Sequence, residues 1–181
     1  MACQRKAGKT LNIDRELSEG YRSPVNRSGL SMVQRYFEDF IVGAALPLGS
    51  HTVTRAEIIA FAAEFDPQPF HLDERQGSAA MVDGLIASGW HVSGLFMRMM
   101  CTGFLLESSS MGSPGIETLK WRKPVRAEDT LTGKSIVLDA RRSRSRPEMG
   151  IVRFRHEVEN QAGETVMWLE NPILFGCREV A

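Results

Sequence analysis

The sequence predicts an α+β domain in which one long apolar helix is wrapped by an antiparallel β-sheet. The first observation is the segment 84–106, in which Arg98 is the only fully charged residue. Apolar side chains cover every side of a 3.6-residue period there, which is typical of a buried helix. The second observation is that the chain after this segment alternates between apolar and polar residues, as half-buried strands do. The length of 181 residues favours a single domain.

A membrane span is the competing interpretation of the segment 84–106. Gly, Ser and His recur in it and Arg98 lies near its middle. The uncharged run that remains is short for a span, and a charge at that depth is costly. We therefore expect a helix enclosed by the rest of the domain and no membrane contact.

Composition and charge exclude several classes of protein. Hydrophobic residues make up 43% of the chain, enough for a sizeable core. Lys and Arg together number 22, as do Asp and Glu, so nucleic acid is not an expected partner. The three cysteines, Cys3, Cys101 and Cys177, are odd in number and far apart. This pattern favours reduced thiols and a cytoplasmic location, and it contains no zinc-binding spacing.

Residues 1–35 differ in composition from the rest. They carry seven Lys or Arg against three acidic residues, with no sustained apolar period. This predicts a flexible N-terminal tail before a domain over 36–181. No apolar signal-peptide region is present, whereas an Arg-rich transit peptide remains an alternative that the acidic residues argue against. Met32 is an alternative start, because the pattern of the domain begins at Tyr36.

The helix before the apolar segment begins at a recognisable cap. Thr54 and Glu57 fit a capping box, in which the Thr54 hydroxyl accepts from the Glu57 N–H and the Glu57 side chain returns to Thr54. The apolar residues of this helix, which recur at three and four residues and predict one buried stripe, are Ile58, Phe61, Ala62 and Phe65. Pro67 ends the helix, so that Asp66 lies at its C-terminus.

The strands are predicted from alternation. The clearest set, expected to face the core together, is Val152, Phe154, His156 and Val158. A turn over 160–163 leads to a longer apolar strand over 165–175, as a central or interface strand would be. Shorter strands are expected near 119–122 and 136–138, and 108–114 is expected to be a loop.

A carboxylate and an imidazole share a stiff loop. Asp66 and His71 flank Pro67 and Pro69, which fix φ and bias the preceding residues toward extended geometry. Such a loop holds both groups in one relative geometry at low entropic cost, as paired acid–base chemistry needs. The helix C-terminus and burial predict a raised Asp66 pKa. The alternative is that both residues only brace a Pro-rich turn.

Gly89 is expected to lie at the beginning of the apolar helix. Its N–H has no intrahelical acceptor there, and the missing Cβ lets a ligand carbonyl approach, which describes an oxyanion donor. A glycine needed only for close packing is the alternative.

Two segments resemble a known family. FAAEFDPQPFHLD followed by GLIASG resembles the signature of MaoC-like dehydratases, the (R)-specific enoyl-CoA hydratase branch of the hot-dog fold. Asp66, Gln68, Pro69 and His71 match its acid, amide, Pro and His. PGIETLKWRKPVRAEDTL resembles the strand and turn that follow in the family, and together the matches cover roughly 36–175. Gln68 stands where Asn is usual, and Ser88 where a His often precedes the Gly.

The resemblance implies a hydro-lyase that reversibly hydrates a 2-enoyl thioester, with coenzyme A as the expected carrier. Asp66 and His71 would hold one water between them, and the Gly89 N–H would stabilise the enolate oxygen. No cofactor is required, because the thioester is itself the electron sink. The candidate substrate-binding residues are Gln68, Ser88, Trp90 and Met97. Family members pair as homodimers, which also covers edge strands, so a homodimer is expected.

Other polar residues are weaker candidates. His156 is expected to be a hydrogen-bonded core residue, His51 a solvated residue at a loop edge, and His91 a residue that could approach a ligand. A basic run is predicted to be a solvated loop, with binding of a coenzyme A phosphate as the alternative: Arg141, Arg142, Arg144 and Arg146. His71 and Asp73 lack further ligands at suitable spacing, so no metal is predicted.

Two other functions remain open at this point. A hot-dog thioesterase would attack the thioester carbonyl and commonly relies on a lone carboxylate near the helix, whereas the nearby His71 favours the hydratase. A non-catalytic acyl-binding module is the third possibility. The sequence leaves open the length and branching of the acyl chain, its thiol carrier, and the direction of the reaction.

Overall fold

The computed structural model describes residues 35–79 and 84–178, so the predicted tail lies outside the described residues except for Arg35. The elements in chain order are η1 (Phe37–Asp39), β1 (Ala45–Thr52), α2 (Arg55–Phe65), α3 (Pro69–Leu72), α4 (Glu74–Ala79), α5 (Gly89–Gly103), η2 (Leu105–Glu107), β2 (Ser110–Gly112), β3 (Thr118–Trp121), β4 (Thr130–Arg142), β5 (Met149–Glu159) and β6 (Thr165–Gly176).

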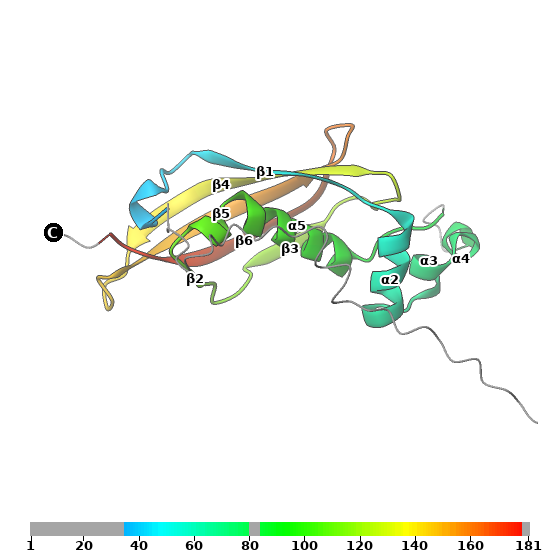
Figure 1. The fold of residues 1–181 in the computed structure, drawn as a ribbon, viewed down its shortest axis with the longest axis horizontal. Coiled ribbons are helices and arrows are strands. Elements are labelled where there is room, and N and C mark those ends of the chain that lie inside the picture. Colours follow the sequence, from blue (N-terminus) through cyan, green and yellow to red (C-terminus); the bar gives the residue numbers. More distant parts are fainter. Residues whose placement is uncertain (1–34, 80–83, 179–181) are drawn as a thin grey trace, which may run out of the picture. The chain divides into compact units, whose positions relative to one another are not determined.

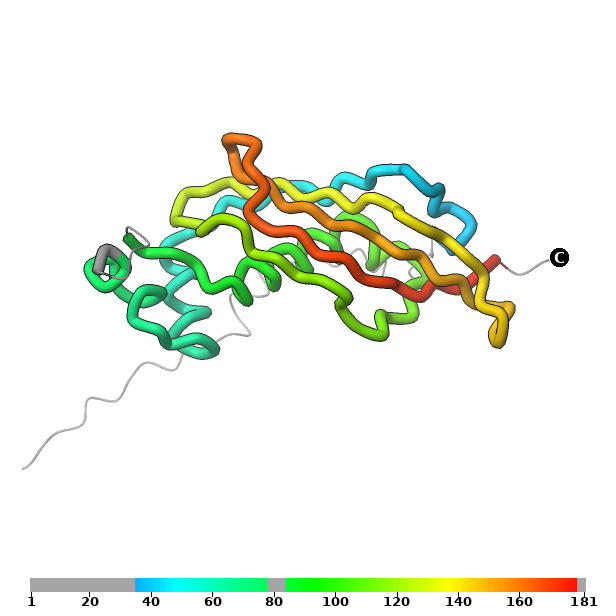
Figure 2. The backbone as a smooth tube through the Cα atoms, turned by 180° about the vertical axis from the view of Figure 1, so that it is seen from behind, coloured from blue at the N-terminus to red at the C-terminus, as the bar shows by residue number. Residues whose placement is uncertain are grey.

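An antiparallel sheet and one helix across it form the domain. The strand order is β1-β4-β5-β6-β2, and β3 also pairs with β6. Figure 2 shows this sheet from the face opposite α5, and Figure 1 shows α5 lying along the other face. The predicted hot-dog arrangement is therefore confirmed. The strand predicted over 165–175 is β6, and it is central as expected, with β5 on one side and β2 and β3 on the other.

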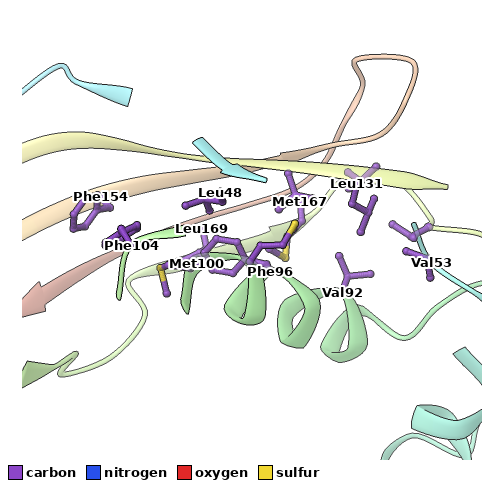
Figure 3. Close-up of a cluster of buried hydrophobic side chains, with 14 of the residues drawn as sticks. Leu48, Val53, Val92, Phe96, Met100, Phe104, Leu131, Phe154, Met167 and Leu169 are labelled. Carbon is purple, nitrogen blue, oxygen red and sulfur yellow. The ribbon is translucent and has the colours of Figure 1, made fainter. Parts of the chain in front are cut away.

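The core fills the space between α5 and the sheet. Val92, Phe96 and Met100 recur at four residues and point from α5 toward the strands, as a single helical stripe does. Figure 3 shows them against buried side chains of the sheet, among them Leu131, Phe154, Met167 and Leu169. Burying each such side chain contributes about 1.5–3 kcal/mol. The predicted stripe of β5, from Val152 to Val158, is fully buried and confirmed.

The expectation that the apolar helix is buried on every side is wrong for this chain. The sheet covers one face of α5, whereas Trp90 is 60% exposed and Met97 45% exposed on the other. The helix begins at Gly89, as expected, after Ser88, which caps it by accepting from the Trp90 N–H. It ends at Gly103, before the end of the apolar segment at residue 106.

Only one of the two hydrogen bonds of the predicted capping box of α2 forms. The Thr54 hydroxyl accepts from the Glu57 N–H at 3.2 Å, which confirms one half of the capping box. The Glu57 carboxylate bonds His51 Nε2 at 2.9 Å instead of returning to Thr54. His51 therefore lies half-buried in β1 and is not a solvated loop residue.

Two further expectations near these elements are corrected. Phe65, predicted in the buried stripe of α2, is 65% exposed and lies against Phe61 with 5.1 Å between ring centroids. It is the last residue of the helix, beyond the part that the core covers. The segment 108–114 is not all loop, since β2 forms within it by pairing with the end of β6.

A buried polar cluster joins three strands at His156. Its Nδ1 accepts from the Ser135 hydroxyl at 2.8 Å, and its Nε2–H donates to Asn171 Oδ1 at 2.8 Å. Both ring nitrogens are thus satisfied in the neutral form, as buried polar groups must be. Burial lowers the pKa of His156 to about 4. The predicted hydrogen-bonded core histidine is confirmed.

We predict that burial of His156 makes the free energy of unfolding of the domain fall as the pH is lowered. The unfolded chain takes up a proton near pH 6.5 and the folded chain only near pH 4, so protons favour the unfolded state between these values. The free energy of unfolding should fall by about 1.4 kcal/mol for each pH unit in this window. Urea titrations from pH 7 to pH 4 measure it. His156→Gln should remove that slope, and parallel slopes for the two proteins would contradict the assignment.

Candidate active site

A cavity of about 710 Å³ lies beside the N-terminus of α5. Its walls come from the loop between α2 and α3, the segment before α5, and the chain that follows β3. It gathers six of the seven residues proposed from the sequence, namely Asp66, Gln68, His71, Ser88, Gly89 and Trp90. Met97 is the exception, since it lies about two turns further along α5, outside the cavity wall and exposed.

His71 is held by the backbone of the segment that precedes α5. The residue lies in α3, a single turn that begins with Pro69, and its side chain is buried. Its Nδ1 lies 2.8 Å from the Ile86 carbonyl oxygen. A carbonyl only accepts, so Nδ1 carries a proton, and in a neutral ring Nε2 is then an acceptor. Nε2 faces Asp66 Oδ2 at 3.4 Å.

Asp66 has the opposite pKa shift from the one that the sequence predicted. Hydrogen bonds from Ser88 and then Gln68 lower its pKa, and together they outweigh burial, which raises it. Gln68 Nε2 donates to Oδ1 at 2.7 Å. The prediction failed because these donors stabilise the anion of a carboxylate that remains 18% exposed. Asp66 is therefore ionised at neutral pH.

Ser88 links the beginning of α5 to the carboxylate. Its hydroxyl oxygen accepts from the Trp90 N–H at 3.2 Å and its proton goes to Asp66. The side chain is almost fully buried, so the two interactions are shielded from water. The sequence marked this position as a departure from the family pattern. In the structure it positions Asp66 from a residue 22 places further along the chain.

Gly89 is packed under an indole ring. It is the first residue of α5, so its N–H has no intrahelical acceptor, as predicted. A Cβ at this position would lie 2.6 Å from Cε2 of Trp121, and the ring is held by a bond from its Nε1 to Ser93 Oγ at 3.3 Å. The alternative role of Gly89, close packing, is therefore supported by a specific contact with the Trp121 ring.

Trp121 is a cavity residue that the sequence analysis did not single out. It lines the wall above Gly89 and meets Trp90 edge-on, with 5.2 Å between ring centroids. The alternation of polar and apolar residues in β3 places Trp121 on the same face of the strand as Leu119. This pattern does not predict the contact of Trp121 with α5, because that contact depends on how β3 and α5 pack together.

His91 and the basic run lie away from the cavity wall. His91 is buried, stacks on Phe61 at 4.9 Å between centroids, and has a pKa lowered by burial. Arg142, at the end of β4, pairs with Glu38 of η1, and Arg146 pairs with Glu148 in the connection between β4 and β5. Figures 1 and 2 place that connection at the end of the sheet opposite α2 and α3.

Residues 35–79 and 84–178 contain neither a candidate metal site nor a candidate membrane-spanning helix. No three His, Cys, Asp or Glu side chains in these ranges are grouped so as to hold a metal ion. No helix in them is long and apolar enough to cross a bilayer.

We predict that Gly89→Ala and Gly94→Ala have opposite effects. Both lie in α5, but a Cβ at Gly94 meets no atom of the same chain within 4 Å, whereas one at Gly89 meets the Trp121 ring. Gly94→Ala should stabilise by up to about 1 kcal/mol through helix propensity. Gly89→Ala should destabilise by about 1–3 kcal/mol, because the ring must move. Thermal unfolding and tryptophan emission measure both, and equal effects would contradict the close contact.

Comparisons with known proteins agree with this fold. A family model described as a MaoC like domain matches residues 43–160. The crystal structure of a MaoC-like dehydratase from Rhodospirillum rubrum is 38% identical, with a TM-score of 0.75 over 80% of this chain and 99% of that one. The uncharacterized protein YdeM of Bacillus subtilis is 28% identical over 124 residues, which are 68% of this chain and 86% of YdeM.

A solved hydratase shares the fold at lower identity. The R-hydratase PhaJ1 from Pseudomonas aeruginosa is 24% identical, with a TM-score of 0.64 over 81% of this chain and 91% of that one. The family model spans well over half of the chain, and the matched range includes all the cavity residues named from the sequence, from Asp66 to Trp90. The chain therefore belongs to the MaoC-like dehydratase domain family.

Proposed function

We propose that the protein catalyses the reversible hydration of a 2-enoyl thioester to a 3-hydroxyacyl thioester, with coenzyme A as the carrier. The observation that carries the proposal is the Asp66 carboxylate facing the His71 imidazole at 3.4 Å inside a cavity. Membership of the dehydratase family supports it, as does the fold shared with a solved R-hydratase.

The pair is suited to hold one water by two acceptors. Asp66 Oδ2 is anionic and His71 Nε2 carries a lone pair, so a water that donates one O–H to each satisfies both. The oxygen of that water then directs a lone pair to the β-carbon of the enoyl group. Because its lowered pKa makes the Asp66 carboxylate a weak base, we assign the proton of the water to His71.

The proposed reaction needs no proton donor or acceptor besides the water and these two residues. As the water oxygen bonds to the β-carbon, one of its protons passes to His71 Nε2 and the carbon–carbon double-bond electrons move toward the thioester carbonyl. The proton on Nε2 is then delivered to the α-carbon, and the enolate returns to the thioester. Ile86 holds the Nδ1 side of the ring, so the same nitrogen takes and returns the proton.

The thioester oxygen is placed at the N-terminus of α5 in this proposal. The Gly89 N–H is available there, and the helix dipole favours the negative charge that develops on the enolate. Trp121 covers the Cα of Gly89, so the indole forms the wall along which the acyl group lies.

We predict that Asp66→Asn and His71→Ala each lower the turnover of crotonyl-CoA by roughly 10² to 10⁴, the usual share of a positioned acid–base group. The loss of enoyl absorbance measures the rate, and circular dichroism checks the fold. Asp73→Asn is the matched control, since Asp73 is an exposed carboxylate of the same region that only caps α4 by accepting from the Arg75 N–H at 2.8 Å.

The control variant should retain the wild-type rate. A folded Asp66→Asn or His71→Ala protein with near-native hydration would exclude the proposed pair from the chemistry.

We also propose that the protein is a homodimer. The outer face of α5 exposes Trp90 and Met97 beside the half-exposed Trp121, and apolar surface of this kind marks an interaction site. A second copy would cover it, together with the unpaired edges of the sheet.

Sedimentation velocity at micromolar concentration should give about twice the monomer mass of 20.2 kDa. Met97→Glu should shift the protein toward the monomer, because it places a charge on the apolar face. A wild-type protein that sediments as a stable and active monomer would contradict the dimer.

A further inference from the structure

A second hollow, of about 490 Å³, adjoins the active-site cavity. The two share Arg122 and Lys123 in their walls. The second is completed by Arg155, Thr165 and Trp168, from β5 and the beginning of β6. A molecule that extends out of the cavity past the shared residues therefore meets this hollow next.

The hollow is lined by cations and no carboxylate. Two of its three cations are held by acids just outside the wall. Lys123 pairs with Glu164, and Arg155 pairs with Glu157 at 2.8 Å while its guanidinium lies 4.3 Å from the centre of the Trp168 ring. These contacts fix the two cations and offset part of their charge.

Arg122 differs from its two neighbours. Its side chain is exposed, and within the described part of the chain it forms no hydrogen bond or ion pair through the guanidinium. Its backbone is nevertheless fixed, because the Arg122 N–H donates to the Val166 carbonyl at 2.7 Å. A positioned arginine whose N–H groups are all available is suited to bind an oxyanion such as a phosphate through two parallel hydrogen bonds.

We infer that this hollow binds the phosphate at the far end of the pantetheine arm of the acyl carrier, with Arg122 as its principal contact. The inference rests on the proposed function, because a thioester at Asp66 and His71 is the point from which the arm leaves the cavity. It also replaces the phosphate site considered for the basic run of Arg141 to Arg146, which lies at the opposite end of the sheet.

The phosphate is common to coenzyme A and to a phosphopantetheine-bearing carrier protein. A charge-assisted hydrogen bond of this kind changes affinity by about tenfold or more. Since Arg122 is exposed, we expect about tenfold, and less at high salt because the charges are screened.

The test compares crotonyl-CoA with crotonyl-pantetheine, which has the same acyl group and arm but no phosphate. For Arg122→Gln, the ratio of kcat/KM for crotonyl-CoA to that for crotonyl-pantetheine should fall about tenfold, mainly through the KM for crotonyl-CoA. Arg144→Gln removes the same charge from an exposed residue of the basic run and should leave the ratio at its wild-type value. An unchanged ratio in Arg122→Gln, or an equal fall in both variants, would overturn the inference while the hydratase function stands.

Calorimetric titration with free coenzyme A and with pantetheine separates this inference from the function. If the wild type hydrates neither thioester, the proposed function fails, but the titration still tests whether the hollow binds a phosphate. Tighter wild-type binding of coenzyme A than of pantetheine, with the difference lost in Arg122→Gln, would support it, and no difference in the wild type would overturn it.

Crotonyl attached to a carrier protein distinguishes the two sources of the phosphate. A comparable loss for that substrate and for crotonyl-CoA in Arg122→Gln supports a phosphate contact. A loss for the carrier-protein substrate alone would assign Arg122 to a protein surface contact and overturn the phosphate site.

Discussion

The hydrogen bond from His71 Nδ1–H to the Ile86 carbonyl is the constraint on which the rest of the site depends. It ties the single turn of α3 to the extended segment that enters α5. Because it occupies Nδ1, it leaves Nε2 as the nitrogen that faces Asp66. Ser88, two residues after Ile86, then reaches the Asp66 carboxylate from the same segment. One backbone carbonyl thus sets the tautomer, the orientation and the partner of the imidazole.

Local patterns in the sequence predicted most of the fold and six of the residues that line the cavity. The alternation in β5 identified a buried face because a strand has a period of two, and the two prolines kept Asp66 and His71 on one short loop. What failed were properties set by distant residues. The lowered pKa of Asp66 depends on Ser88, and the partner of Glu57 is His51 in β1.

The exposed face of α5 was missed for a related reason. Apolar periodicity shows which residues avoid water, but it does not show whether the cover comes from the same chain or from another. Trp90 and Met97 are exposed here because the sheet of one chain reaches only one side of the helix. The contact between Gly89 and Trp121 could not be predicted from the sequence either, because it depends only on how α5 and β3 pack together.

The most direct test of the central claim follows crotonyl-CoA by two signals at once, the absorbance of the enoyl thioester and the release of free thiol. If Asp66 and His71 activate a water for attack at the β-carbon, the enoyl absorbance falls to an equilibrium value while no thiol is released. Thiol release that keeps pace with substrate loss would mean attack at the carbonyl and a thioesterase. Binding of crotonyl-CoA with neither signal would mean a non-catalytic acyl-binding module.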